Sequence, residues 1–307
     1  MRYGERFHKV TGSGNDFVAF DRLGEGSGVA LPAPAVVRAL CSRGEGIGAD
    51  GVLVLVDEPG VDYRLVYFNA DGSRAELCGN ASLCGVRLAV ELGRSDPSAV
   101  SFVTDAGLMR GRITDGLPEI DLTPPHDLSA DRSELWPAIG GAGAGERRLG
   151  YVRVGVPHLV VLCDSAEAAE LERRGPLLRR HPALADGANV NFVSSAEDGA
   201  WTMRTFERGV EGETLACGTG SVATALLLTT WAMTVGAGVA DAGSAEGRTN
   251  GAAGDEARES GVPTVRIRTR SGRLHRVSLR GDAGDYRPSL AGEGRIVYRG
   301  ELGEGDW

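Results

Sequence analysis

Short runs of alternating apolar and polar residues dominate the first part of the chain, a pattern that predicts β-strands separated by turns. A polar turn at Gly12–Asp16 divides the segment Arg6–Asp21 into two strands, and Pro34–Cys41 is expected to be a short helix. Further strands are predicted at Asp50–Asp57, Tyr63–Phe68, Val100–Thr104, Met109–Ile113 and Ile120–Leu122.

The second part of the chain repeats this order loosely. A helix is expected near Ser165–Arg174, and the segments Thr264–Thr269 and Leu274–Leu279 form a predicted hairpin around a Gly-containing turn. The other predicted strands are Tyr151–Val154, Leu159–Cys163, Asn189–Ser194, Ala200–Phe206 and Arg295–Tyr298.

Three stretches have the composition of mobile insertions. Ile139–Glu146 is rich in Gly and Ala, Val235–Gly261 is rich in Gly, Ala, Ser and charge, and Ser289–Gly294 is a shorter turn. The middle stretch has no hydrophobic periodicity, so we expect it to be flexible.

Two cysteines lie in nearly identical short sequence motifs. Cys78 and Cys217 are each followed by Gly, preceded by a polar Gly-containing loop, and placed before an apolar segment expected to be helical (81–92 and 221–233). A helix N-terminus favours a thiolate, because its unpaired N–H groups and the helix dipole stabilise negative charge. The two cysteines are 139 residues apart (positions 78 and 217), a spacing that indicates two similar half-molecules, each presenting one thiol.

Composition limits the possible functions. The chain has 307 residues, 42% hydrophobic and 24% charged, which suits two globular domains. A net charge of -9 argues against nucleic-acid binding, which requires a basic face. Lys9 is the only lysine, so it is the one residue that could form a Schiff base with pyridoxal phosphate.

The five cysteines do not have the number or spacing of a secreted disulfide framework or of a zinc site. No signal peptide and no apolar run long enough to span a bilayer is expected, so the predicted location is the cytoplasm, away from membranes. Cys41, Cys84 and Cys163 are interpreted as core residues, because an isolated cysteine is more often a small buried side chain than a nucleophile.

Other polar residues are candidates for substrate binding. The N–H groups after each cysteine, at Gly79 and Gly218, could form a nest for a carboxylate. Arg208 could bind a second carboxylate, although Glu207–Arg208 could equally be a surface ion pair. The asparagines at 15, 69, 80 and 191 could be turn formers, and His158 could be structural.

Taken together, these residues resemble the diaminopimelate epimerase family. The resemblance covers most of the chain, and its most specific motif is the segment Glu213–Gly220. The other matching segments, in chain order, are Gly12–Phe17, Gly46–Asp50, Phe68–Ser73, Cys78–Asn80, Pro157–His158, Asn189–Phe192 and Glu207–Gly209.

The resemblance implies an α+β fold, a tandem repeat of two similar domains. Each would be a mixed β-sheet curled around a central helix, with the active site in the cleft between them. The first domain would span residues 1–123 and be completed by the C-terminal strand at 293–307, and the second would span 124–292. It also implies a homodimer.

The implied activity is cofactor-independent, two-base epimerisation of LL-2,6-diaminopimelate to the meso form, in lysine and peptidoglycan biosynthesis, with no metal. Cys78 and Cys217 would be the acid–base pair. His158 would support the cysteines or the substrate amine. The substrate-binding residues implied by the resemblance are Asn15, Asn69, Gly79, Asn80, Asn191, Glu207, Arg208, Gly218 and Thr219.

The sequence departs from the family pattern at a few positions. Ala81–Leu83 replaces a frequent Gly-Ala-Arg, Val156 stands where Asn often precedes Pro-His, and Gly51 stands where many relatives carry Gln. These departures affect substrate contacts and leave both thiols in place.

Two alternative functions remain open. A proline or hydroxyproline epimerase or racemase would share the two-thiol plan, but its substrate has a single carboxylate and needs no distal clamp. A non-enzymatic thiol-redox or metal-binding protein is the alternative from another class.

Overall fold

A computed structural model of the chain describes residues 3–26, 28–236, 262–282 and 284–304, with side chains up to Met233 in the longest helix. The chain forms two compact units, unit 1 from residues 1–121 and 291–307 and unit 2 from residues 122–290. These boundaries lie two residues before those expected from the sequence. The insertion predicted at 235–261 lies outside the described residues from position 237 onward.

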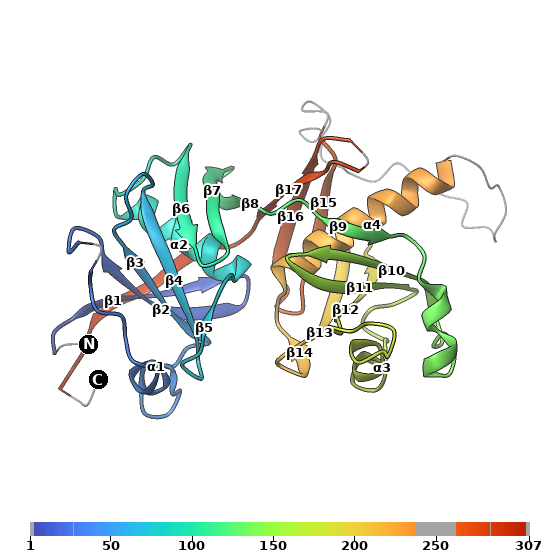
Figure 1. Ribbon diagram of the computed structural model, residues 1–307, viewed down its shortest axis with the longest axis horizontal. Coiled ribbons are helices and arrows are strands. Elements are labelled where there is room, and N and C mark those ends of the chain that lie inside the picture. Colours follow the sequence, from blue (N-terminus) through green and yellow to red (C-terminus); the bar gives the residue numbers. More distant parts are fainter. Residues whose placement is uncertain (1–2, 27, 237–261, 283, 305–307) are drawn as a thin grey trace. The chain divides into compact units, whose positions relative to one another are not determined.

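Unit 1 contains one mixed sheet (Figure 1). The pairs β2–β3 and β4–β6 are parallel and the others are antiparallel, while β5 (Arg74–Ala75) pairs with the end of β4. The neighbouring strands are, in order, β18 (Arg295–Glu301), β1 (Arg6–Gly12), β2 (Asn15–Arg22), β3 (Gly51–Val56), β4 (Tyr63–Asn69), β6 (Val100–Thr104), β7 (Gly107–Thr114) and β8 (Leu117–Asp121).

Unit 2 has the same topology. The parallel pairs are β11–β12 and β13–β15, and β14 (Gly212–Thr214) pairs with the end of β13 as β5 does with β4. β17 (Arg287–Ala291) is the last strand of the repeat. The other neighbouring strands are, in order, β9 (His126–Ser129), β10 (Glu146–Val154), β11 (Val156–Cys163), β12 (Asn189–Ser195), β13 (Trp201–Glu207), β15 (Thr264–Arg268) and β16 (Leu274–Arg280).

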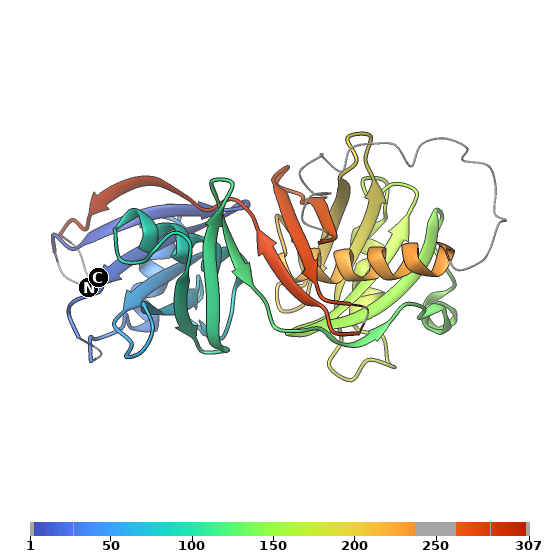
Figure 2. The same ribbon diagram turned by 90° about the horizontal axis from the view of Figure 1, so that it is seen from above.

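Each sheet surrounds one buried helix. In unit 1, α2 (Gly79–Glu91) contacts β1, β3, β4, β7, β8 and β18, and nine of its residues are buried. In unit 2, α4 (Gly218–Gly236) contacts β10, β11, β12, β15 and β16, and Figure 2 shows it lying across these strands. Both helices are apolar around much of their circumference, which is typical of a helix enclosed on several sides. The α+β prediction, with a mixed sheet around a central helix in each half, is confirmed.

The opposite face of each sheet carries a second, shorter helix. Side chains of α1 (Pro34–Cys41) pack with Val52, Val54 and Val56 of β3, and α3 (Leu171–Arg179) packs over β12 and β13. All residues of β3 are therefore buried, because the strand has a helix on both faces. The continuous apolar run in its sequence follows from that position.

The strand pairings within each unit show which residue of unit 1 is equivalent to which residue of unit 2. Tyr63 pairs with Phe102 across β4–β6, and Trp201 pairs with Ile267 across the equivalent β13–β15. The same comparison matches the following residues of unit 1 and unit 2: Asn15 with Val156, Phe17 with His158, Leu53 with Asn191, Asn69 with Glu207, and Met109 with His275.

Three expectations from the sequence are wrong. The helix expected near Ser165–Arg174 begins only at Leu171, because the carbonyl groups of Ala166, Glu167 and Ala169 accept hydrogen bonds from the Arg204 guanidinium instead of helix N–H groups. Ser289–Gly294, expected to be a mobile turn, begins inside β17, where Ser289 and Leu290 are fully buried.

The Gly/Ala-rich stretch Ile139–Glu146, also expected to be mobile, is held by a buried arginine. Arg174 donates to the carbonyl oxygens of Ile139 and Gly141 at 3.1 and 2.9 Å, and forms a 2.7 Å ion pair with Glu146. Both side chains of the pair are about 5% exposed or less. Two short 3₁₀ turns, η1 (Ser133–Leu135) and η2 (Pro137–Ile139), precede this stretch. Arg174 therefore helps to fix the segment between η2 and β10, together with the Gly143 N–H, which donates to Glu146 Oε2 at 2.6 Å.

In the described part of the chain, none of the helices combines the length and apolar character needed to cross a bilayer.

The buried pair gives a stability prediction. Arg174→Met leaves the Glu146 carboxylate buried without its partner, so the free energy of unfolding is expected to fall by about 3–5 kcal/mol in urea titrations. The exposed neighbouring pair Arg173–Glu170 supplies the control, because solvent screens this pair and Arg173→Met should leave the free energy of unfolding nearly unchanged. Equal losses for the two variants would contradict a fixing role for Arg174.

Candidate active site

Cys78 is the residue immediately before α2 and has extended backbone angles, φ -134° and ψ 118°. The first hydrogen bond of the helix runs from the Ser82 N–H to the Cys78 carbonyl at 2.9 Å. The N–H groups of Gly79, Asn80 and Ala81 therefore have no acceptor within the helix. They form the N-terminus of the helix that follows Cys78, where they can bind an anion.

A chain of amide and carboxylate groups leads away from this helix start. Asn80 Nδ2 donates to Asn15 Oδ1 at 2.7 Å, and Asn15 Nδ2 donates to Asp50 Oδ2 at 3.0 Å. Arg43 binds the other oxygen of Asp50 at 2.7 Å. Because Asp50 can only accept, the chain fixes the orientation of both amides. Asn80 and Asn15, both predicted to bind substrate, are therefore in direct contact.

Lys9 belongs to the same network. Its ammonium group lies 2.7 Å from Asp16 Oδ2 and donates to the Gly48 carbonyl, and the side chain is 9% exposed. Although burial opposes it, hydrogen bonding to Arg43 and Lys9 holds the pKa of Asp16 below its usual value. The one lysine of the chain is thus used to fix the turn between β1 and β2.

Asn69 lies at the end of β4 and forms a turn. Its side-chain Nδ2 donates to Ser73 Oγ at 3.0 Å, and its backbone N–H donates to the Ser73 carbonyl at 2.8 Å. The turn requires Gly72, which has φ +87° and whose Cα lies so close to Pro34 that a Cβ would come within 2.6 Å of a carbonyl oxygen. Asn69 is half-buried.

Cys217 occupies the equivalent place in unit 2 and is 7% exposed. The Gly220 N–H donates to Cys217 Sγ at 3.4 Å, and Thr219 Oγ1 lies 3.6 Å from the same sulfur. The Ser221 N–H closes the first helical hydrogen bond to the Cys217 carbonyl at 3.0 Å. The first turn of α4 thus supplies a backbone donor directly to the sulfur, which stabilises its thiolate form.

Asn191 connects this turn to the sheet. Its Oδ1 accepts from Thr205 Oγ1 at 2.9 Å, and its Nδ2 donates to the Leu159 carbonyl at 3.0 Å and lies 3.3 Å from His158 Nδ1. The residue is fully buried. Both ends of the Asn191 amide therefore form hydrogen bonds within unit 2, and its Oδ1 lies next to Gly220.

His158 is also fully buried, and its charged form is disfavoured. Burial, and to a smaller extent the charge of Arg208, lower the pKa of His158 to about 3. The imidazole is therefore neutral at physiological pH, and it accepts through Nδ1 the hydrogen bond from Asn191. Its Nε2 is buried without a hydrogen-bond partner among the described residues.

Glu207 is the last residue of β13, where the strand pairs with β14, and Arg208 follows it. Burial raises the pKa of the Glu207 carboxyl, while the neighbouring Thr214 side chain opposes the shift. The Arg208 N–H donates to Asn189 Oδ1 at 2.7 Å, and its guanidinium donates to the Asp186 carbonyl at 3.0 Å. Both residues remain half-buried, so their side chains keep part of their surface accessible.

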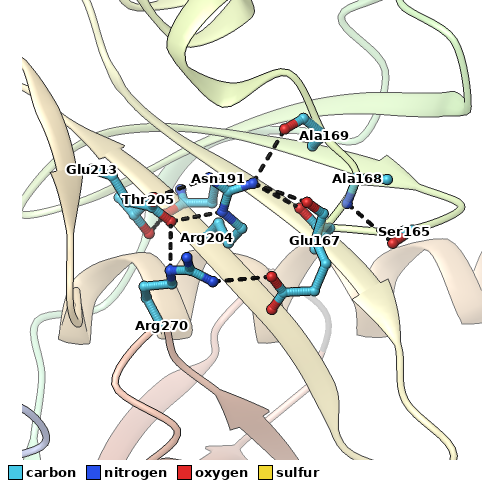
Figure 3. A network of polar contacts seen from close by, with 10 residues as sticks. Ser165, Glu167, Ala168, Ala169, Asn191, Arg204, Thr205, Glu213 and Arg270 are labelled. Carbon is cyan, nitrogen blue, oxygen red and sulfur yellow. Dashed lines mark hydrogen bonds and ion pairs between the residues drawn. The ribbon is translucent and has the colours of Figure 1, made fainter.

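Figure 3 shows the ion pairs that hold the strand leading to Cys217. Arg204 binds both oxygens of Glu213 at 2.7 and 2.9 Å, and Arg270 Nε lies 3.5 Å from the same carboxylate. Arg270 also binds Glu167 at 3.0 Å. The Ser271 N–H, in the β15–β16 turn, donates to the Leu215 carbonyl at 2.9 Å. Residues 213–215, just before the cysteine, are thus anchored at several points.

The other cysteines differ from this pair. Cys41, Cys84 and Cys163 are buried, and burial raises the pKa of Cys41 and Cys163 to about 11. These thiols are protonated at neutral pH. None of the five cysteines forms a disulfide.

Within each unit, the structure brings together some of the predicted residues. The group in unit 1 contains Cys78, Gly79, Asn80 and Asn15. The group in unit 2 contains Cys217, Gly218, Thr219, Asn191 and His158. The sequence interpretation did not single out the residues that orient them. Asp50 and Asn189 were within recognised motifs, whereas Arg43, Thr205, Ser221 and His275 carried no signal of their own.

Comparisons with known proteins agree on one family. The family model described as Diaminopimelate epimerase matches residues 7–122 and 150–237. A diaminopimelate epimerase of Gemmatimonas aurantiaca is 45% identical over 306 residues, 96% of this chain and 98% of that protein. The diaminopimelate epimerase of Aquifex aeolicus is 37% identical over 232 residues, 72% of this chain and 80% of that protein.

Solved structures show the same fold at low sequence identity. A phenazine biosynthesis protein of the PhzF family from Bacillus anthracis has a TM-score of 0.69 and 14% identity, covering 98% of this chain and 99% of its own. A probable proline racemase from Agrobacterium radiobacter, with bound carbonate, has a TM-score of 0.60 and 19% identity, covering 97% and 92%.

The packing above Asn191 predicts the effect of a small substitution. A Cβ on Gly220 would lie 2.5 Å from Asn191 Oδ1 and 3.1 Å from Cys217 Sγ, so Gly220→Ala must displace the amide or the thiol. We expect about tenfold slower alkylation of Cys217 by iodoacetamide, because a loss near 1.4 kcal/mol corresponds to tenfold. Gly212→Ala is the control, because its Cβ meets no atom within 4 Å. Unchanged Cys217 reactivity in Gly220→Ala would refute this contact.

Proposed function

The chain belongs to the diaminopimelate epimerase family and is an isomerase, and we propose that it interconverts LL- and meso-2,6-diaminopimelate without a cofactor. The observation that carries the proposal is the pair of cysteines, each at the N-terminus of the buried helix of a unit with the same topology. The substrate is a small molecule, and the reaction belongs to lysine and peptidoglycan biosynthesis.

The proposed mechanism uses the two thiols as acid and base. One cysteine, as thiolate, removes the proton from the α-carbon, and the other, as thiol, delivers a proton to the opposite face. The first then carries a proton and the second becomes a thiolate, so the roles exchange when the reaction runs in reverse. The mechanism requires both sulfur atoms to reach one carbon from opposite sides.

The carbanion formed on proton removal needs stabilisation, because an amino-acid α-proton is only weakly acidic. Its negative charge extends onto the adjacent carboxylate. The first-turn N–H groups of α2, at Gly79 and Asn80, and of α4, at Gly218 and Thr219, are the donors proposed to bind that carboxylate. Donors fixed in advance at two helix starts stabilise this charge without reorganisation.

The remaining residues are proposed to hold the distal part of the substrate. Arg208 offers a cation for the second carboxylate, while Glu207, Asn15 and Asn69 offer acceptors and donors for the amino groups. His158 and Asn191, both fully buried, act on the site through the first turn of α4. This distal group distinguishes diaminopimelate from proline, which has a single carboxylate.

A cytoplasmic location and a homodimer complete the proposal. The C-terminal strand β18 supports the dimer, because Val297 and Tyr298 are 45% and 46% exposed on a strand that pairs with β1 along one edge. A groove of about 430 Å³ lies between this strand and Arg87 and Glu91 of α2. Exposed apolar residues on an edge strand suit pairing with a second copy.

Removing either thiol tests the two-base proposal. Cys78→Ala and Cys217→Ala are each expected to lose epimerisation by a factor of about 10³ or more, because each loses one step of proton transfer. Chromatographic separation of the LL and meso isomers measures the rate, with L-proline assayed alongside. Cys41→Ala is the control, because Cys41 is the last residue of α1 and its side chain lies in the core. Full activity in either active-site variant, or faster turnover of proline, would contradict the proposal.

The dimer can be tested separately. Tyr298→Asp places a charge in the exposed apolar part of β18, so we expect a shift from dimer to monomer in sedimentation velocity. The control is Leu177→Asp on α3, an apolar residue that is 45% exposed in the other unit. A monomeric wild-type protein, or a dimer indifferent to Tyr298→Asp, would exclude this arrangement.

A further inference from the structure

Behind the first turn of α4, a buried histidine contacts the helix that begins after Cys217. His275 Nδ1 lies 2.8 Å from Ser221 Oγ, and the same hydroxyl donates to the Cys217 carbonyl at 3.2 Å. His275 and Ser221 are both fully buried. Two hydrogen bonds thus connect strand β16 to the backbone of the cysteine.

The hydrogen-bonding capacities of these groups determine the direction of the connection. A serine hydroxyl has one proton, and the Cys217 carbonyl can only accept, so Ser221 donates to that carbonyl. His275 Nδ1 must then carry a proton and donate it to Ser221 Oγ. In this tautomer Nε2 of His275, which has no partner in the described chain, is left as an acceptor.

The ionisation state of His275 fits this arrangement. Burial lowers the pKa of His275 to about 4, so the imidazole is neutral throughout the pH range in which a thiol titrates. His158 on β11 contacts Asn191, which lies next to Gly220 of the same turn, and burial lowers the pKa of this second histidine to about 3. Neither histidine gains a proton above pH 5, so the connection does not switch in that range.

Unit 1 lacks this connection, although it has the equivalent serine. Ser82 follows Cys78 by four residues, as Ser221 follows Cys217, and it is also buried. Strand register matches His275 with Met109, whose side chain cannot donate a hydrogen bond. Ser82 Oγ accordingly has no hydrogen-bond partner among the described residues. The difference is therefore specific to the Cys217 half of the repeat.

From this geometry we propose that His275 and Ser221 are positioning residues for Cys217. They hold the Cys217 carbonyl, and with it the Cys217–Gly218 peptide, in the orientation that directs the Gly220 N–H at the sulfur. The Cys217 thiolate is stabilised by that N–H, so the connection favours Cys217 over Cys78 as the base of the resting enzyme. This inference rests on the proposed role of Cys217 in catalysis.

The test compares four variants by the pH dependence of Cys217 alkylation, followed by mass spectrometry of the labelled peptide. His275→Leu and Ser221→Ala should slow alkylation near pH 7 about fivefold and move the midpoint of the profile to higher pH, because one hydrogen bond is lost. His275→Asn should restore most of the rate, since its amide Nδ2 can take the place of Nδ1. Ser82→Ala is the matched control and should leave the Cys217 profile unchanged.

Thermal unfolding identifies variants that are merely destabilised, and Ser221→Ala, the smaller change, keeps the test decisive if His275→Leu fails to fold. Folded variants with the wild-type Cys217 profile would overturn the proposal, as would failure of His275→Asn to exceed His275→Leu. Because alkylation needs no substrate, the outcome is separate from the proposed function. A wild-type protein inactive on diaminopimelate, with the alkylation differences present, would contradict the function and leave the positioning role standing.

Discussion

The structure depends on a helix that starts at a cysteine and is then enclosed by a sheet. Enclosure leaves the first-turn N–H groups, such as those of Gly79 and Asn80 in unit 1, as a polar end of an otherwise apolar element, without acceptors inside the helix. A thiol at that end lies in the positive field of the helix, and the sheet fixes where it points. In unit 2, this arrangement produces the 3.4 Å hydrogen bond from the Gly220 N–H to Cys217 Sγ.

The two units use the same topology with different supports. In unit 1 the helix start is oriented by a charged chain through Asn80, Asn15 and Asp50 to the partly exposed Arg43. In unit 2 the equivalent support is buried and neutral, and consists of Asn191, Thr205 and the two histidines. The two thiols therefore lie on equivalent backbones but next to different polar networks, one charged and one neutral. This difference suits two groups that must act as acid and base in turn.

Much of this could be predicted from the sequence, because local patterns carry it. A continuous apolar run located β3, the alternation of apolar and polar residues located β6, and the Cys-Gly motifs located both helix starts. What was missed depends on long-range contacts. The segment before α3 looks helical, but Arg204 binds its carbonyl groups. β9 is mostly exposed and gives no hydrophobic pattern. His275 lies 58 positions after Cys217, and only the folding of β16 onto α4 brings it to Ser221.

The central claim is that two groups exchange protons with one α-carbon. The most direct measurement follows LL-diaminopimelate in D₂O at low conversion, with the isotope at the α-carbon determined by mass spectrometry for product and for recovered substrate. The account predicts deuterium in nearly every product molecule and almost none in the recovered substrate, because the proton removed by one thiol is not the one delivered by the other. Product that retains its original proton, or substrate that gains deuterium as fast as product forms, would contradict it.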